Sequence, residues 1–534
     1  MLDPLPSSRW NFTTAAHLLN RAGFGGTSAE IERLEKMGLD AAVDQLVEYE
    51  KTPDTTANPE WAKPDAERRE KFQALRVASM EERKKMQQEE RMKQRRRVLE
   101  LRGWWLERMA RGPRPLQEKL TLFWHGHFAT SVQKVKDAYL MWLQNETFRS
   151  LASGHWTQML MAVTKDPAML VWLDQGQSRK LHPNENYARE VMESFTLGEG
   201  HYTELDIAEA ARAFTGLAYD RVQQTSDFRY RNHDDGSKTV LGKEGDLTWT
   251  DVLQQIVAQP QAGCFICAKL WSFFATERPG DQLVDSLAAV FRKSGDRFKP
   301  LLHVLFRSQE FYADTVIRSQ VKSPVQWLVG SVKMLERGLP PAPVASNWLA
   351  NLGQDLFAPP NVKGWDGGIS WITTNNLLAR YNQAEMLVQG SGRLELNSNR
   401  KAAKFMERRF NRSQGKASPI AVGEMFPPPE RGQKDLLIAA LERRFVQGRL
   451  KPRQEQVLRD YLDERGTLED EDILEIIRLT MSTPEYQLTW NYEHRTFLSN
   501  PARFPAHDHA DGGFELDRAG ISLPHVRCAP SRSG

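Results

Sequence analysis

The segment from residue 65 to residue 111 most constrains the fold, because its composition favours helix almost exclusively. It is rich in Glu, Lys, Arg, Gln and Met, contains no proline, and has a single glycine, Gly103. These residue types are strong helix formers, and opposite charges recur one turn apart. Apolar residues such as Phe72 and Met92 are too sparse for a sustained heptad seam. The segment predicts one or two long exposed helices lying on a larger body.

Most of the remaining chain shows helical periodicity, broken by loops at 221–247 and 353–372. The predicted fold class is therefore all-α: a large multi-helix body with a long exposed N-terminal helix, inserted loops and a disordered C-terminal tail. The predicted regions are N-terminal helices including the long charged helix (1–114), a central helical body (115–390), a C-terminal helical region (391–499) and an irregular tail (500–534).

Composition and charge limit the class of function. The formal net charge of +3 over 534 residues argues against a surface devoted to nucleic acid. Three cysteines are too few for a disulfide-stapled secreted scaffold, and no apolar run is long enough for a membrane span. The N-terminus shows no basic region followed by an apolar one. We therefore expect a cytoplasmic protein, or a periplasmic one if the N-terminus is misassigned.

Residues 182–198 form the most informative functional motif, an amphipathic helix with both ends marked. Asn184 can cap its start and Gly198 can close its end. One face is apolar, and the other carries Asn186, Arg189, Glu190 and Glu193. Glu190 and Glu193 lie one turn apart, so their carboxylates are neighbours.

Neighbouring carboxylates repel each other unless something compensates their charge. Arg189, a divalent cation or water could do so. The pattern is compatible with a metal or general acid/base site, with a solvated face, and above all with a buried Arg–Glu network that joins helices. The turn after Gly198 should bring Tyr202 and Glu204 to the end of this helix, where a polar corner could line a pocket.

His125 and His127 form a His-x-His motif within a segment that is expected to be helical. On a helix the two side chains lie about 200° apart. Both could bind one metal ion only if the helix breaks at Gly126. We expect one packed histidine and one exposed or hydrogen-bonded histidine, with shared metal binding as the alternative.

The loop Asn361-Val-Lys-Gly-Trp-Asp-Gly-Gly368 has the chemistry of a tight turn. Trp365 could plug the core or stack on a sugar, and the first role is favoured. Lys363 could meet an anion or one of the acids of the 182–198 helix. Asn361 is included with these two residues as a candidate binding group.

Several motifs together resemble a bacterial family called domain of unknown function 1800. They are HLLNRAGFGGTSAEI, PLQEKLTLFWHGHF, NENYAREVMESFTLGEGHYTELDIAEAARAFTG, PPNVKGWDGG and STPEYQ, and they span roughly residues 15 to 490. The resemblance implies a mainly α-helical fold and no established reaction. It also implies export signals in many members, and genes that often lie beside one for an alkaline-phosphatase-like partner. The chain departs from the exported members because no signal is visible.

Two hypotheses for the function follow. The first is an accessory or scaffold protein that acts with an enzyme partner, which the resemblance suggests is alkaline-phosphatase-like. The alternative is a metal-assisted enzyme, hydrolytic in type, in which Glu190, Glu193 and His125 are metal ligands or acid/base groups and His127 is a further ligand. In an enzyme the polar faces of 118–127 and 184–206 should converge on one cavity. In a scaffold they should face solvent or pair with arginines.

Overall fold

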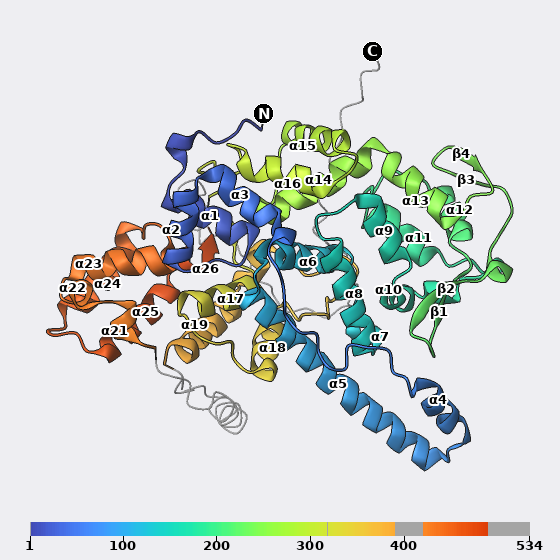
Figure 1. Ribbon diagram of the computed structural model, residues 1–534, viewed down its shortest axis with the longest axis horizontal. Coiled ribbons are helices and arrows are strands. Elements are labelled where there is room, and N and C mark those ends of the chain that lie inside the picture. Colours follow the sequence, from blue (N-terminus) through green and yellow to red (C-terminus); the bar gives the residue numbers. More distant parts are fainter. Residues whose placement is uncertain (1, 318, 390–419, 490–534) are drawn as a thin grey trace, which may run out of the picture.

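The computed structural model describes residues 2–317, 319–389 and 420–489 and is mainly helical (Figure 1). This confirms the predicted fold class. Strands are confined, within these residues, to three antiparallel two-stranded sheets. The predicted irregular tail, residues 500–534, and the beginning of the predicted C-terminal region lie outside the described residues. No described helix is both long enough and apolar enough to cross a membrane.

The first half of the chain holds the N-terminal helices, the long charged helix and the helices that carry the functional motifs. These helices are α1 (Phe12–Ala22), α2 (Ser28–Met37), α3 (Leu39–Val47), α4 (Arg68–Val77), α5 (Met80–Arg111), α6 (Pro115–His127), α7 (Val132–Val135), α8 (Ala138–Ser150), α9 (Trp156–Thr164), α10 (Pro167–Trp172), α11 (Glu185–Glu193) and α12 (Glu204–Ala213).

The second half continues in helices, with short gaps and a few strands. Its helices are α13 (Trp249–Ala258), α14 (Pro260–Phe274), α15 (Asp281–Lys293), α16 (Phe298–Arg307), α17 (Pro324–Met334), α18 (Ala342–Asn351), α19 (Thr374–Gln389), α21 (Val422–Met425), α22 (Pro428–Arg431), α23 (Lys434–Leu441), α24 (Pro452–Asp463), α25 (Asp470–Ser482) and α26 (Pro484–Gln487). The paired strands are β1 (Leu217–Asp220) with β2 (Thr225–Phe228), β3 (Lys238–Val240) with β4 (Lys243–Gly245), and β5 (Gln320–Val321) with β6 (Leu488–Thr489).

The predicted long charged helix is α5, which has 32 residues and extends away from the body (Figure 1). Ser79 and Glu82 form a capping box at its start. Only its C-terminal third is buried, through side chains such as Leu101 and Trp105. Helix α4 is held near the body because Arg68 donates to the carbonyl of Arg221 (2.6 Å) and pairs with Asp137 (2.9 Å).

Two hydrophobic clusters make up the core. The first joins α1–α3, α6, α9 and α11–α16, and the second joins α5, α17–α19 and α23–α25. Helix α6 contributes to both, because Leu120 and Trp124 belong to the first cluster and Leu122 to the second. Nearly every side chain of α6 is buried, including its polar ones. A buried polar group is costly without a partner, so each of these needs one from a neighbouring element.

Glu118 is the most demanding of the buried polar groups on α6, because it is a charge and is only 2% exposed. Its carboxylate accepts hydrogen bonds from Arg108 of α5 (2.8 Å), Arg149 of α8 (2.8 Å) and the Trp105 indole (2.9 Å). Burial alone would raise the pKa of Glu118, but the charges and hydrogen bonds of Arg149 and Arg108 hold it below its ordinary value. The core thus holds a buried Arg–Glu network that joins α5, α6 and α8 and is centred on Glu118, whereas the sequence predicts such a network around Arg189 on the 182–198 helix.

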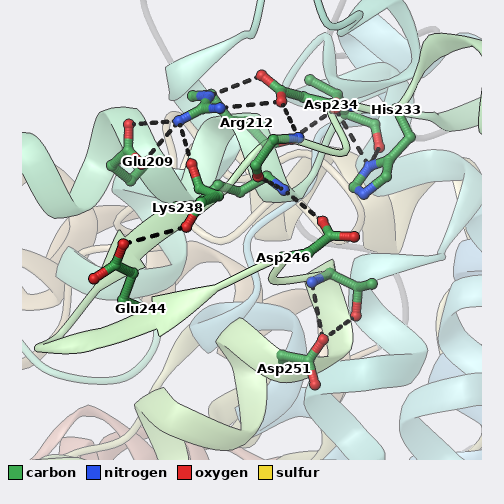
Figure 2. Close-up of polar contacts among 12 residues, drawn as sticks. Glu209, Arg212, His233, Asp234, Lys238, Glu244, Asp246 and Asp251 are labelled. Carbon is green, nitrogen blue, oxygen red and sulfur yellow. Dashed lines mark hydrogen bonds and ion pairs between the residues drawn. The ribbon is translucent and has the colours of Figure 1, made fainter.

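The β3–β4 hairpin is fastened to α12 by a second set of polar contacts (Figure 2). Arg212 of α12 pairs with Asp234 (2.8 Å) and Glu209 (2.9 Å), and it also donates to the carbonyl of Ser237 (3.1 Å). Lys238 of β3 bonds Asp246 (3.2 Å) across the hairpin. Because the cations and acids here satisfy one another, we interpret this cluster as a structural attachment.

We predict that Glu118→Gln destabilises the protein by about 3 kcal/mol, since removing one partner of a buried ion pair leaves uncompensated charge. The free energy of unfolding in urea measures the effect. Glu107→Gln is the matched control, because Glu107 also lies near an arginine but its side chain is 48% exposed. Equal stability of the two variants would contradict the role given to Glu118.

Candidate functional site

Helix α11 begins where the sequence predicts, but it ends at Glu193 and not at Gly198. The side chain of Asn184 accepts a hydrogen bond from the backbone of Asn186 (3.0 Å), and its amide donates to the carbonyl of Asp174 (3.1 Å). After the helix, Gly198 has a φ of +81°, a conformation that glycine adopts without strain. Asn184 therefore fastens α11 to the preceding turn, and the exposed side chain of Asn186 lies at the helix surface.

Arg189 connects α11 to α12 at the surface. Its guanidinium donates two hydrogen bonds to Glu204 (2.8 and 2.7 Å) and lies 3.6 Å from Glu185. The side chains of Arg189 and Glu204 are 36% and 76% exposed. Exposed ion pairs contribute roughly 0–1 kcal/mol. The expected Arg–Glu connection between helices is thus present on α11, but the structure places it at the surface.

The two central carboxylates of α11 are half-buried and each has a partner within the chain. The Tyr202 hydroxyl donates to Glu193 (2.9 Å), which realises the predicted polar corner. The Ser194 hydroxyl donates to Glu190 (2.6 Å). Burial raises the pKa of Glu190, and the negative charge of Glu193 raises it further.

A lysine from α14 joins this group. The Lys269 ammonium donates to the carbonyl of Ser194 (2.9 Å), just beyond α11, and lies 4.6 Å from the ring centre of Phe265. Burial lowers the pKa of Lys269 to about 8, and the negative charge of Glu190 opposes this shift. Sequence reasoning missed Lys269. The sequence does single out Lys269, because it is the one charged residue in the apolar run AGCFICAKLWSFF.

The loop that carries Asn361, Lys363 and Trp365 packs onto α6. The Asn361 side chain accepts from the backbone of Lys363 (2.9 Å), and Gly364 has a φ of +90°. A Cβ on Gly364 would lie 2.3 Å from the carbonyl oxygen of Gly126, so only glycine fits there. Trp365 donates to the carbonyl of Asp355 (3.1 Å) and packs against the second core cluster. Lys363 lies close enough that its positive charge lowers the pKa of Glu190.

The two histidines of α6 face different surroundings. His127 contacts the carbonyl of Phe195 (3.0 Å), directly after α11. The Asn145 amide nitrogen donates to His125 Nε2 (3.0 Å), and the His125 ring packs against the rings of Trp105 and Phe357. We expected one packed histidine and one exposed or hydrogen-bonded histidine. In the structure both histidines are buried and each makes a hydrogen bond. Burial lowers the pKa of His125 to about 3 and that of His127 well below its ordinary value.

We name Glu190, Glu193, Tyr202, Lys269 and Lys363 the acidic-helix site. It brings together four of the sequence-predicted residues and one cation that the sequence analysis overlooked, while His127 reaches the same region only through the Phe195 carbonyl. His125 is turned toward α8. Among residues 2–317, 319–389 and 420–489, no group of three or more His, Cys, Asp or Glu side chains could hold a metal ion. The site can fasten α6, α11, α14 and the 361–368 loop together.

The model of the family described as "Protein of unknown function (DUF1800)" matches residues 17–488. The chain belongs to this family. The match covers all five residues of the acidic-helix site. No curated protein and no solved structure matches the chain.

We predict that Gly364→Ala lowers stability by about 2 kcal/mol, because alanine is strained at positive φ and its Cβ would overlap the Gly126 carbonyl. Gly367→Ala is the control, since Gly367 has a φ of −119° and open space around its Cα hydrogens. Thermal and urea unfolding measure both. An equal loss in the two variants would show that the loop does not depend on this contact.

We also predict that His125→Gln reduces the loss of unfolding free energy that accompanies a fall in pH below about 6.5. The folded-state pKa of His125, about 3, lies below its ordinary value near 6.5, so its unfolded form binds the proton more readily. Its stabilising contribution is therefore complete above about pH 6.5 and is lost as the pH falls toward 3. Urea midpoints between these values measure the slope. The exposed His182→Gln should leave the slope unchanged, and an unchanged slope in His125→Gln would contradict the assignment.

Proposed function

We propose that this chain is a non-catalytic helical scaffold that binds an enzyme partner through its projecting arm, which we define as residues 68–100. The charge of the arm is the observation that carries the proposal. It holds twelve Lys and Arg residues and six Glu residues, a net charge of +6, whereas the whole chain has a net charge of +3. The remainder of the chain is therefore slightly acidic. A cationic arm on such a body favours association with an acidic partner surface.

The arm also presents apolar side chains to solvent. Val77 is 87% exposed, Met80 is 78% exposed and Met92 is 61% exposed. Arginine and methionine are both enriched at protein–protein interfaces. These features support a protein partner for the arm. Nucleic acid is the less favoured partner, because aromatic side chains that could stack on bases are sparse there.

The acidic-helix site supports a scaffold role for the body. Each of its acids already has a group of the same chain beside it, Tyr202 for Glu193 and Ser194 for Glu190. The hydrogen bond from Lys269 to the Ser194 carbonyl then joins α14 to the end of α11, across 75 positions of the sequence. The resemblance to the family then suggests which partner to test first, an alkaline-phosphatase-like enzyme with an acidic surface.

The alternative is a metal-assisted hydrolase that uses Glu190, Glu193, His125 and His127. It is less well supported, because His125 bonds Asn145 while the two glutamates bond Ser194 and Tyr202. Elemental analysis of the native protein tests it. A near-stoichiometric divalent metal that is lost in Glu190→Gln would favour the hydrolase over the scaffold.

The scaffold proposal predicts that charge on the arm controls affinity for the partner. The triple variant Lys84→Glu, Lys85→Glu, Arg91→Glu should bind the alkaline-phosphatase-like enzyme at least about ten-fold more weakly, and wild-type affinity should fall with salt. These three side chains are exposed and form no ion pair within the described chain. Isothermal titration calorimetry with the two purified proteins measures the effect.

The matched control keeps the charge and changes only the side chain: Lys84→Arg, Lys85→Arg, Arg91→Lys. It should bind like the wild type, and circular dichroism should show equal helix content in all three proteins. Equal affinity of the charge-reversed and control variants would reject the arm as the docking surface. Absence of binding in the wild type would reject this partner.

A further inference from the structure

Two cationic side chains lie buried where α1 meets α6. Arg21 of α1 is 2% exposed and Lys119 of α6 is 5% exposed. Buried cations are normally paired with a carboxylate, because removing an isolated charge from water is costly. Within the described residues, however, no carboxylate lies within 4.0 Å of either cation. The fold thus holds two like charges together in its interior.

The hydrogen-bond partners of both cations are neutral and incomplete. Arg21 donates to the Gln320 side chain, to the carbonyl of Val316 (3.1 Å) and to Ser319 (3.2 Å), while its Nε is buried without a partner. The Lys119 ammonium has three donor hydrogens and donates one hydrogen bond, to Gln326 Oε1 (3.2 Å), within the described residues. Donors therefore remain available on both cations.

Hydrogen bonds through Gln326 link Lys119 to the backbone next to Arg21. Gln326 accepts from Lys119 through its oxygen, and its amide donates to the carbonyl of Asn20 (2.9 Å), the residue before Arg21. The positive charge of Arg21 acts on Lys119. Together with burial, which is the larger cause, it lowers the pKa of Lys119 to about 7. Two aromatic rings enclose the ammonium, with the Phe24 and Phe273 centres at 5.1 and 5.5 Å.

We infer that Arg21 and Lys119 form a binding site for a small monovalent anion of the chloride or bromide type. Such an ion would accept hydrogen bonds from the free donors and neutralise the paired charges. A monovalent ion fits better than phosphate, because a doubly charged anion loses more hydration and would need more donors than these two side chains supply. This site is independent of the proposed partner binding.

Chloride-35 NMR tests the inference directly on the full chain. Bound chloride broadens the bulk signal, so the wild type should show excess linewidth that bromide suppresses by competition and gluconate does not. Lys119→Met should lose most of this excess at a pH below the pKa of Lys119. Lys180→Met is the matched control, because Lys180 is an exposed lysine, and it should keep the wild-type linewidth.

A second measurement covers the case in which Lys119→Met does not fold. Crystals of the wild-type protein grown in bromide should show an anomalous difference peak within hydrogen-bond distance of Lys119 Nζ and Arg21. No peak at saturating bromide would overturn the site. The site would also be overturned if the wild type showed no excess linewidth. Equal linewidths in folded Lys119→Met and Lys180→Met would overturn it as well.

Discussion

The burial of polar side chains on α6 is the constraint on which the rest of the structure depends. A helix that is buried on every side can carry such groups only if each finds a partner in another element. Glu118 meets Arg108 of α5 and Arg149 of α8, Lys119 meets Gln326 of α17, and His127 meets the backbone after α11. The positions of the surrounding helices are therefore set by hydrogen bonds as well as by apolar packing.

The same helix links the regions to which we assign roles. Its C-terminal end supports the loop that carries Lys363, because Gly364 packs against Gly126, and that loop reaches the acidic-helix site. Its N-terminal half holds Lys119 of the inferred anion site. Arg108, which pairs with Glu118, lies near the buried end of α5, whose other end forms the arm. A partner bound to the arm would thus contact a helix whose other end is fixed to the core by a buried ion pair.

Local features of the fold could be predicted from the sequence, and distant contacts could not. The cap at Asn184, the capping box of Thr203 with Asp206 and the long helix α5 depend on neighbouring residues alone, and the structure contains all three. The buried state of Glu118 depends on Arg149, 31 positions away. Lys269 meets Ser194 across 75 positions, so spacing could not place it in the acidic-helix site. The division into regions at residues 114, 390 and 499 stays a prediction.

Hydrogen–deuterium exchange measured along the whole chain tests the central position of α6 most directly. If α6 is the element that the other helices hold in place, its amides should exchange only when the whole protein unfolds, together with those of α8 and the buried end of α5. The exposed residues of the arm should exchange much earlier. Exchange of α6 before that of the outer helices α13–α16 would contradict this account.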